Sequence, residues 1–354
     1  MEQQTRRPQK PRRGLTGFFM ILSILLCLIL AALLLIGWLS QRSRAAETLA
    51  QTQSLEQQLE EAQARVAELE ETTIPIETFK GYAQQYSPST EFIQQFFPDK
   101  LVYKDETGIV YADIDESLPQ NSYDWQYLSR NNGRYSYEPP DGPAALFGID
   151  VSKHQGEIDW QRVKADGISF AMLRAVYRGY GASGNLRVDE TFEENLEGAL
   201  AAGLDVGIYV FSQAVTEEEA IEEAELALSL IEGRDIAYPV VFDMEEIAGD
   251  AARTAGLTTE EITDIAIAFC DTVEAAGYEP MIYGNLKWLA AKMDLSRLTG
   301  YDKWLAQYYR TPAFPYEFQM WQYTSTGQVD GISGDVELNL CFAEYPKNDL
   351  EQTE

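Results

Sequence analysis

Cysteine and histidine are both scarce in this chain. Its 354 residues include three cysteines, at positions 27, 270 and 341, and a single histidine. Three scattered thiols do not build a disulfide framework, and no cluster of Cys and His has the spacing of a zinc site. We therefore expect neither a disulfide scaffold nor a metal centre, and we interpret Cys270 and Cys341 as small core residues.

Positive charge is also scarce. Lysine and arginine total 27 against 57 aspartates and glutamates, which gives a net charge of −30. Seven of the basic residues lie within residues 1–44, so the rest of the chain is even more acidic than the total suggests. This field repels nucleic acid and anionic lipid, so we expect neither as a partner, and its ordinary consequence is solubility.

Only one long apolar run is present. Residues 15–39 are almost wholly apolar and long enough to cross a hydrocarbon core of about 30 Å as a helix. The basic tail at 1–14 precedes this run, so the positive-inside bias predicts a cytoplasmic N-terminus, with residues 40–354 outside. Cleavage of a signal peptide near Ala45-Ala46 is the alternative, although the run exceeds the usual apolar core of about 7–15 residues.

A heptad-like spacing follows the apolar run. Apolar side chains recur at intervals of four and three among Gln and Glu residues, at Leu55, Leu59, Ala62, Val66 and Leu69. This pattern predicts a coiled-coil stalk over residues 40–74, ended by Ile74-Pro75, that would join two copies in a homodimer. About three heptads are marginal alone, so a single helix lying against another surface is the alternative.

Residues 76–143 are rich in aromatic and turn-forming residues. Strand-like pieces at 100–103 and 108–111 predict either a small β-containing accessory region or an extended arm that packs on the rest of the chain. We see no pattern there that indicates chemistry. At the other end of the chain, residues 346–354 form an acidic tail.

Apolar strand-like segments alternate with amphipathic helical segments over residues 144–345. Strands are expected at 144–150, 168–174, 204–211, 237–243, 280–283, 303–307, 317–323 and 335–341, and helices at 157–166, 189–202, 216–232, 258–277 and 285–293. Such alternation indicates parallel strands with crossover helices. Eight strands and five helices predict an α/β fold, an incomplete β/α barrel whose active site lies at the carboxyl ends of the strands.

Two of these strands end in acidic residues. The run at 238–242 leads into Asp243-Met244-Glu245-Glu246, and alternation of side chains places Asp243 and Glu245 on one face. A second apolar run ends at Asp150. Charge is costly to bury, so the three carboxyls predict a shared site. Capping of a following helix, or pairing with Lys and Arg, is the structural alternative.

A series of short motifs occurs in order over the same region. They are Asp150-Val151-Ser152, Gln155-Gly156, Ile158-Asp159-Trp160, Asp243-x-Glu245, Met281-Ile282-Tyr283, Trp304-Leu305-Ala306 and Trp321-Gln322-Tyr323. In combination these motifs resemble the family 25 glycoside hydrolases, which are peptidoglycan muramidases of the lysozyme type. The resemblance implies a modified barrel, in agreement with the strand count, and a peptidoglycan glycan strand as substrate. It implies no cofactor.

The resemblance also implies roles for the carboxyls. Glu245 would be the general acid, Asp243 would orient or stabilise the substrate's N-acetyl group, and Asp150 would lie in the same pocket. Two residues along a strand are about 6.6 Å apart at Cα, near the boundary between the carboxyl spacings of retaining and inverting glycosidases. The stereochemical outcome therefore stays open.

Aromatic and amide side chains at other strand ends suit a polysaccharide, because sugars present apolar faces and hydroxyl edges. The expected substrate-binding residues are Tyr209, Tyr283, Trp304, Gln307, Trp321 and Gln322. Barrel core is the alternative for each Trp. His154 is interpreted as a loop residue, since two-carboxylate chemistry needs no imidazole. The acidic run at 217–225 is interpreted as a solvated helix face.

Three positions depart from the family pattern. Met244 and Glu246 stand where the family commonly has an aromatic residue and a proline, and Glu337, in Val336-Glu337-Leu338-Asn339, stands where it has aspartate. We expect Glu337 to contact substrate in the same pocket. Because Asp243 and Glu245 are retained, we expect an active enzyme, while the longer acid at 337 favours the alternative of a catalytically weak peptidoglycan-binding module that anchors an envelope complex.

The expected function is that of a bacterial, single-pass membrane-anchored muramidase. It would hydrolyse the β-1,4 bond between N-acetylmuramic acid and N-acetylglucosamine by carboxylate acid catalysis, with the catalytic barrel outside the membrane.

Overall fold

The structure, a computed structural model, describes residues 14–247 and 252–345, apart from the side chains of 14–16 and 70–72. The acidic tail, and all but the last residue of the basic tail, lie outside the described residues. The chain divides into two units, Met1–Tyr82 and Ala83–Glu354, which we describe separately.

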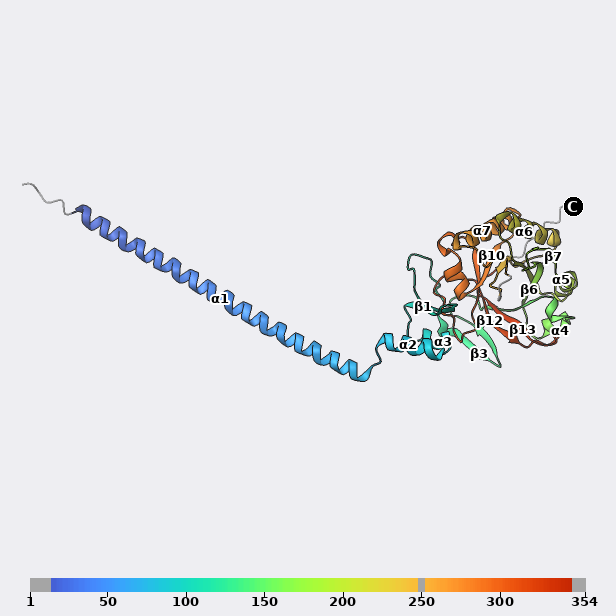
Figure 1. Cartoon of the computed structure of the whole chain (residues 1–354), viewed down its shortest axis with the longest axis horizontal. Helices are drawn as coiled ribbons and strands as arrows, with labels where there is room; N and C mark the ends of the chain where they lie inside the picture. Colours follow the sequence, from blue (N-terminus) through green and yellow to red (C-terminus); the bar gives the residue numbers. More distant parts are fainter. Residues whose placement is uncertain (1–13, 248–251, 346–354) are drawn as a thin grey trace, which may run out of the picture. The chain divides into compact units, whose positions relative to one another are not determined.

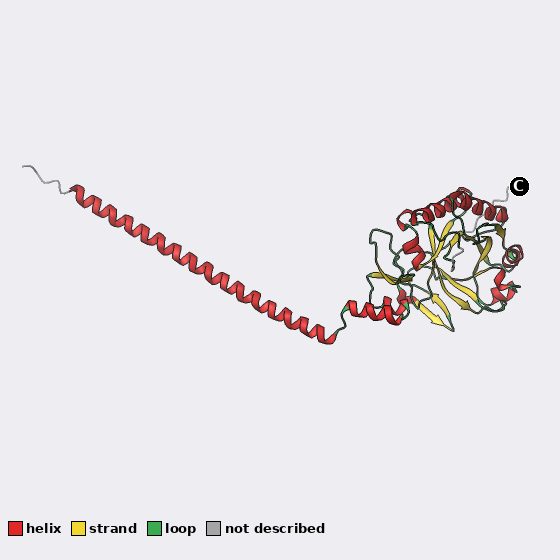
Figure 2. Ribbon diagram, viewed as in Figure 1, coloured by secondary structure: helices red, strands yellow, loops and turns green. Residues whose placement is uncertain are grey.

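The first unit is dominated by α1 (Gly14–Thr72), one continuous α-helix of 59 residues (Figure 2). It ends two residues before Ile74, and α2 (Ile76–Tyr86) begins after Pro75. In the described part of the chain, α1 is the one helix whose length and composition would allow it to cross a membrane. An N-terminal signal sequence can meet the same criteria of length and composition. Residues 17–69 are exposed along the helix, so pairing through the heptad positions stays a prediction.

Eight strands of the second unit close into a barrel. In order around it they are β5 (Leu146–Val151), β13 (Val336–Cys341), β12 (Met320–Gly327), β11 (Asp302–Ala306), β10 (Pro280–Asn285), β9 (Val240–Met244), β8 (Asp205–Ser212) and β6 (Phe170–Arg178), which pairs with β5. The eight expected strands are confirmed. One further short strand, β7 (Leu186–Val188), pairs antiparallel with the last residues of β6, on the same edge of β6 whose first residues pair with β5.

Seven barrel strands run parallel, and β13 runs antiparallel to both of its neighbours. This reversal places the start of β13 beside the carboxyl ends of the other strands. A register shift between Arg174 and Val176 marks a bulge in β6 against β8, a device that often re-aims side chains next to active sites.

Helices cover one side of the barrel, as Figure 1 shows for α4–α7. Their bounds are α4 (Trp160–Ala165), α5 (Phe192–Ala201), α6 (Glu217–Ile231) and α7 (Thr259–Ala275). The fifth expected helix contains a π-helical turn, η3 (Trp288–Lys292). Thr258 and Glu261 form a capping box at the start of α7, which satisfies backbone N–H groups that a helix leaves unpaired.

Two apolar cores follow from the alternation of side chains along the strands. The inner core fills the barrel near the starts of the parallel strands and includes Phe170, Met172, Val241 and Met281. Gly148 makes room for it, because a Cβ there would lie 2.3 Å from the Phe170 ring. The outer core packs the opposite strand faces against the helices and contains Cys270. Cys341 points into the barrel and belongs to the inner core.

An accessory region covers the side of the barrel that lacks helices. It contains α3 (Thr90–Gln94) and two hairpins, β1 (Lys100–Asp105) with β2 (Gly108–Asp113) and β3 (Leu128–Asn131) with β4 (Arg134–Tyr137). Its connecting segment bonds to the barrel loop before β12, where Asn121 N donates to Pro315 O at 2.9 Å. The Tyr123 hydroxyl donates to Phe318 O at 2.6 Å. The region therefore contains the expected strands and packs as an arm on the barrel.

Candidate active site

A cavity of about 400 Å³ opens at the end of the barrel where the parallel strands finish. Its walls come from all eight barrel strands and from the loops that follow some of them. The lining residues are Asp150, Ser152, His154, Gln155, Arg174, Tyr209, Phe211, Asp243, Glu245, Tyr283, Trp304, Tyr308, Gln322 and Glu337. The three predicted carboxyls thus share one cavity, and Glu337 lies in it with them.

Asp243 and Glu245 project together from the end of β9, as period-two alternation predicts. Asp243 is 5 % exposed, and its Oδ1 has no hydrogen-bond partner. Burial, followed by the charges of Glu245 and Asp150, raises its pKa well above the ordinary value. Burial and then the charge of Glu337 raise the pKa of Glu245 as well. Both groups are thus held toward their protonated forms.

Asp150, near the end of β5, is the best-bonded carboxyl of the set. Its Oδ2 accepts from Gln322 Nε2 at 3.0 Å and from Asn339 Nδ2 at 2.8 Å. Burial and the charge of Glu337 raise the pKa of Asp150 to about 8, although the two amide bonds act in the opposite direction. The amides fix the carboxyl in place, and burial disfavours its charge.

Glu337 enters the cavity because β13 is antiparallel. It is the second residue of β13 and is paired with Asp150 on β5. Gln155 Nε2 donates to its Oε2 at 3.5 Å. Burial raises the pKa of Glu337. Four carboxyls in one partly buried cavity do not all ionise together near neutral pH, because each charge disfavours its neighbours' charges.

The predicted aromatic and amide residues divide into two groups. Tyr209, Tyr283, Trp304 and Gln322 line the cavity. Gln322 Oε1 accepts from the Tyr283 hydroxyl at 3.0 Å, and the Trp304 indole donates to Asn339 at 2.9 Å. The polar groups of Tyr283, Trp304 and Gln322 thus belong to the hydrogen-bond network around Asp150.

We expected Trp321 and Gln307 at the rim of the cavity, but neither residue is part of the cavity wall, so this expectation is wrong. Trp321 neighbours the inward Gln322 along β12, so alternation turns it outward, where its ring lies 5.1 Å from that of Tyr135. Its indole donates to Gln307 O at 2.7 Å. Gln307 is buried beyond the end of β11, and its Oε1 accepts from Ala313 N.

Five further cavity residues were missed by sequence reasoning: Ser152, Gln155, Arg174, Phe211 and Tyr308. Arg174 follows the inward Phe170 and Met172 at period two, so alternation was the available signal. Its guanidinium forms an ion pair with the fully buried Asp189 at 2.7 Å. His154, interpreted as a loop residue, lies in the short 3-10 helix η2 (Lys153–Gln155) and lines the cavity.

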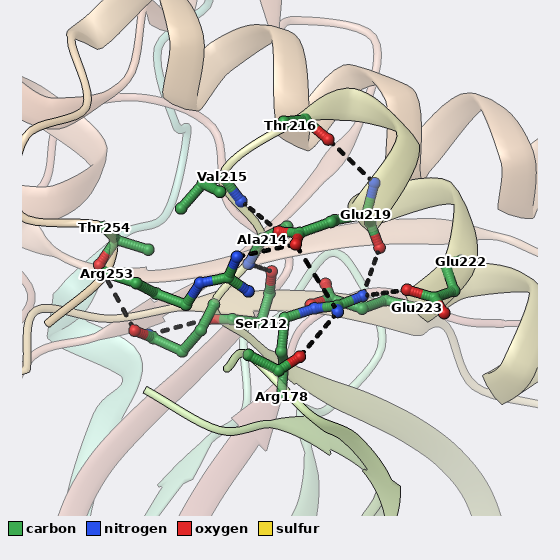
Figure 3. Close-up of polar contacts among 12 residues, drawn as sticks. Arg178, Ser212, Ala214, Val215, Thr216, Glu219, Glu222, Glu223, Arg253 and Thr254 are labelled. Atoms are coloured by element: carbon green, nitrogen blue, oxygen red, sulfur yellow. Dashed lines mark hydrogen bonds and ion pairs between the residues drawn. The ribbon is translucent and has the colours of Figure 1, made fainter. Parts of the chain in front are cut away.

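The acidic run at 217–225 is not simply a solvated face, which corrects the expectation. Glu223 is completely buried, and its Oε1 lies 2.6 Å from Nε of Arg178, itself 4 % exposed (Figure 3). Arg178 also binds Glu222 at 2.8 Å, and Glu219 binds Arg253 at 2.7 Å. The buried residues of α6 recur at intervals of three and four, at Ala220, Glu223, Ala224, Ala227 and Ile231, so helical periodicity was the available signal for the inward Glu223.

This ionic network lies next to residues that support Glu245. Gln213, fully buried just after β8, donates from Nε2 to the main-chain oxygens of Ser212 at 2.9 Å and Glu245 at 3.4 Å. Its Oε1 accepts from Thr254 Oγ1 at 3.4 Å. Because β9 ends at Met244, Glu245 lies beyond the strand pairing, and Gln213 contacts its backbone there.

The other departures from the family pattern have structural explanations. Met244 faces the outer core and is completely buried. Glu246 is exposed and forms an ion pair with Lys287 at 2.6 Å. Within residues 14–247 and 252–345, no group of three or more His, Cys, Asp or Glu residues is arranged to hold a metal ion.

Comparison with known proteins adds independent information. Residues 149–332 match the family model described as Glycosyl hydrolases family 25. The chain is 31 % identical over 222 residues to the uncharacterized protein YegX of Escherichia coli (strain K12), covering 58 % of this chain and 75 % of that protein. It is 30 % identical over 218 residues to Lysozyme M1 of Streptomyces globisporus, covering 56 % and 69 %.

Among solved structures, a bacterial lysozyme from Streptomyces coelicolor aligns with a TM-score of 0.47 at 27 % identity, over 58 % of this chain and 94 % of that one. The family match spans more than half of the chain, and both sequence relatives are covered over more than two thirds of their length. This chain therefore belongs to glycosyl hydrolase family 25 and is a lysozyme-type glycoside hydrolase.

Proposed function

We propose that this lysozyme-type enzyme is an N-acetylmuramidase that cleaves the β-1,4 bond between N-acetylmuramic acid and N-acetylglucosamine in peptidoglycan. The observation that carries the proposal is the joint placement of Asp243 and Glu245 in one cavity, each with a raised pKa. Hydrolysis of a glycosidic bond needs one protonated carboxyl and one further carboxyl beside the reacting sugar.

Glu245 is the general acid in this proposal. Its raised pKa favours the protonated form, which can give its proton to the leaving glycosidic oxygen. As that bond breaks, positive charge develops on the sugar ring. The neighbouring carboxyls Asp150 and Glu337 share the cavity, and any negative charge on them stabilises this ring.

Asp243 orients the N-acetyl group of the substrate. Its buried Oδ1 has no partner, so it is a free acceptor at the cavity wall. A substrate amide N–H fits such an acceptor, and an oriented N-acetyl group can itself assist the displacement. Leaving a buried acceptor unpaired costs free energy that binding of a donor recovers.

We further propose that α1 anchors the enzyme in the cytoplasmic membrane, with the barrel outside. The basic tail before residues 15–39 supports this orientation. A cleaved signal peptide is the alternative, since a signal sequence also passes the test of length and composition that α1 passes. Peptidoglycan lies outside that membrane, so the anchor would hold the barrel next to its substrate.

The test is digestion of purified peptidoglycan by the full-length protein in detergent micelles, with mass analysis of the new reducing ends. Ends of N-acetylmuramic acid support the proposal, and ends of N-acetylglucosamine indicate a glucosaminidase instead. Binding to peptidoglycan without turnover, in the wild type and in Glu245→Gln alike, would favour the catalytically weak binding module.

A further inference from the structure

The accessory helix α3 is bonded to the loop that follows β11. The Tyr309 hydroxyl donates to Thr90 Oγ1 at 2.6 Å, and Arg310 N donates to Glu91 Oε1 at 2.7 Å. The preceding residue, Tyr308, lines the catalytic cavity, and its hydroxyl donates to Gln322 Oε1 at 2.8 Å. One short loop therefore contributes to the catalytic cavity and holds α3 beside it.

A second groove, of about 500 Å³, lies between α3 and this loop. It is lined by Ser89, Glu91, Phe92, Gln95, Arg310 and Thr311. The Phe92 side chain is 53 % exposed, and its ring packs edge-on against Phe96, with ring centroids 5.2 Å apart. Phe96 is 52 % exposed. Both phenyl rings are thus exposed to solvent, Phe92 as part of the groove lining and Phe96 packed beside Phe92.

The chemistry of this groove suits a carbohydrate. Sugar rings offer apolar C–H faces to aromatic side chains, while their hydroxyl and acetamido groups need hydrogen-bond partners. Beside Phe92, the groove supplies an amide from Gln95 and a guanidinium from Arg310. A lipid surface fits less well, because the net charge of −30 repels anionic headgroups.

The groove is also within reach of a glycan held in the catalytic cavity. Tyr308 lines the cavity and Arg310 lines the groove. Two residues along a chain are at most about 7 Å apart, a distance that one or two further sugar units cover. The cavity and the groove thus have lining residues only two positions apart on one loop, a separation that a single glycan strand can span.

We propose that α3 and residues 308–311 form an additional glycan-binding subsite in which Phe92 and Phe96 contact sugars outside the catalytic cavity. The proposal rests on the proposed muramidase function and extends it. Phe92 and Phe96 precede the family match at 149–332, so this part of the subsite belongs to the accessory region. The accessory region would thereby give the enzyme a preference for long glycan strands.

The test compares two peptide-free substrates, a tetrasaccharide of alternating N-acetylglucosamine and N-acetylmuramic acid and long glycan strands of the same sugars. The full-length protein is assayed in detergent micelles. In Phe92→Ala, we expect kcat/KM for long strands, relative to the tetrasaccharide, to fall roughly threefold to tenfold, mainly through KM. Phe92→Tyr keeps a ring and should restore the ratio.

Leu146→Ala is the matched control, because Leu146 is an exposed apolar residue at the start of β5, away from the carboxyl end. An unchanged ratio in Phe92→Ala overturns the subsite, as does an equal fall for both substrates. Failure of the wild type to cleave either substrate contradicts the muramidase proposal instead. In that case, binding of the protein to long glycan strands is measured by co-sedimentation. Weaker binding in Phe92→Ala than in the wild type still supports the subsite, and equal binding overturns the subsite.

Discussion

Asp150 and Glu337 occupy directly paired positions on β5 and β13, two antiparallel neighbours in the barrel. Both side chains line the catalytic cavity. Like charges directly opposite each other on a sheet are unfavourable, and the charge of Glu337 is the leading electrostatic cause of the raised pKa of Asp150 and of Glu245, after burial. Glu337 is therefore placed to control how readily the catalytic carboxyls ionise.

Replacing Glu337 with Gln should shift the pH dependence of the reaction. Removing this negative neighbour lowers the pKa of Glu245, which must be protonated to act as the acid. Activity is lost as pH rises through that pKa, so the alkaline limb of the pH–rate profile should move to lower pH. Rates of peptidoglycan solubilisation from about pH 4 to 9 measure the shift.

Glu337→Asp is the matched control and should retain activity and most of the wild-type profile. It keeps the charge, although misplacement by about 1 Å can be costly in an active site. An alkaline limb that stays in place in Glu337→Gln would remove Glu337 from the electrostatics of the site and leave Asp150, Asp243 and Glu245 as its working carboxyls.

Replacing Glu245 with Gln should abolish most of the turnover and leave binding intact. A positioned general acid contributes about 100-fold or more to the rate, and Gln has no proton to give. We expect kcat to fall by at least roughly 100-fold, while co-sedimentation with insoluble peptidoglycan stays near the wild-type level. Glu246→Gln is a suitable control, since the exposed Glu246 pairs with Lys287 and lies outside the cavity lining. Near-normal turnover in Glu245→Gln would assign the acid elsewhere.

Replacing Asp243 with Asn should stabilise the fold while impairing catalysis. The folded-state pKa of Asp243 is raised by burial and neighbouring carboxyls, so its ionisation costs stability as pH rises above the unfolded value of about 3.9. We expect Tm at pH 8 to rise by roughly 2–4 °C. At pH 4 the gain should be small, because Asp243 is protonated in the folded state. Asp235→Asn, at an exposed carboxyl, provides the comparison. An equal gain at both pH values would contradict the explanation.

Breaking the Arg178–Glu223 pair should destabilise the barrel. Glu223→Ala leaves the guanidinium of Arg178 buried without its closest partner, which typically costs about 3–5 kcal/mol. Chemical denaturation measures the loss, and Glu222→Ala, at a position 62 % exposed, should cost less than about 1 kcal/mol. The double variant Arg178→Met, Glu223→Leu should lose less free energy of unfolding than the sum of the losses in Arg178→Met and in Glu223→Leu. Additive losses would show that the two charges do not depend on each other.

External protease applied to spheroplasts should remove the barrel and leave a membrane-held stub that contains residues 15–39. The basic residues before that segment predict a cytoplasmic N-terminus. A mature protein that starts near Ala46 would contradict the anchor and indicate a cleaved signal peptide. Crosslinking through a Cys introduced at Leu59 or Val66 would test separately whether α1 pairs with a second copy.

The sequence by itself determined the local features of this protein. Alternating apolar segments located eight barrel strands and five helical segments, because local hydrophobic periods differ between strands and helices. The same alternation placed Asp243 and Glu245 on one side at the end of β9. The expected strand ends placed Asp150 near them. The apolar character of residues 15–39 is likewise a property of composition alone.

Tertiary structure decided the direction and neighbours of each element. Only the antiparallel course of β13 brings Glu337 opposite Asp150 at the cavity rim. Alternation places Trp321 and Gln322 on opposite faces of β12, but only the packing of the accessory region shows that Trp321 is the outward one. Only the packing of α6 shows that Glu223 pairs with Arg178. These outcomes depend on contacts between residues far apart in the chain, which local periodicity does not encode, and the free energy of burial and pairing selects them.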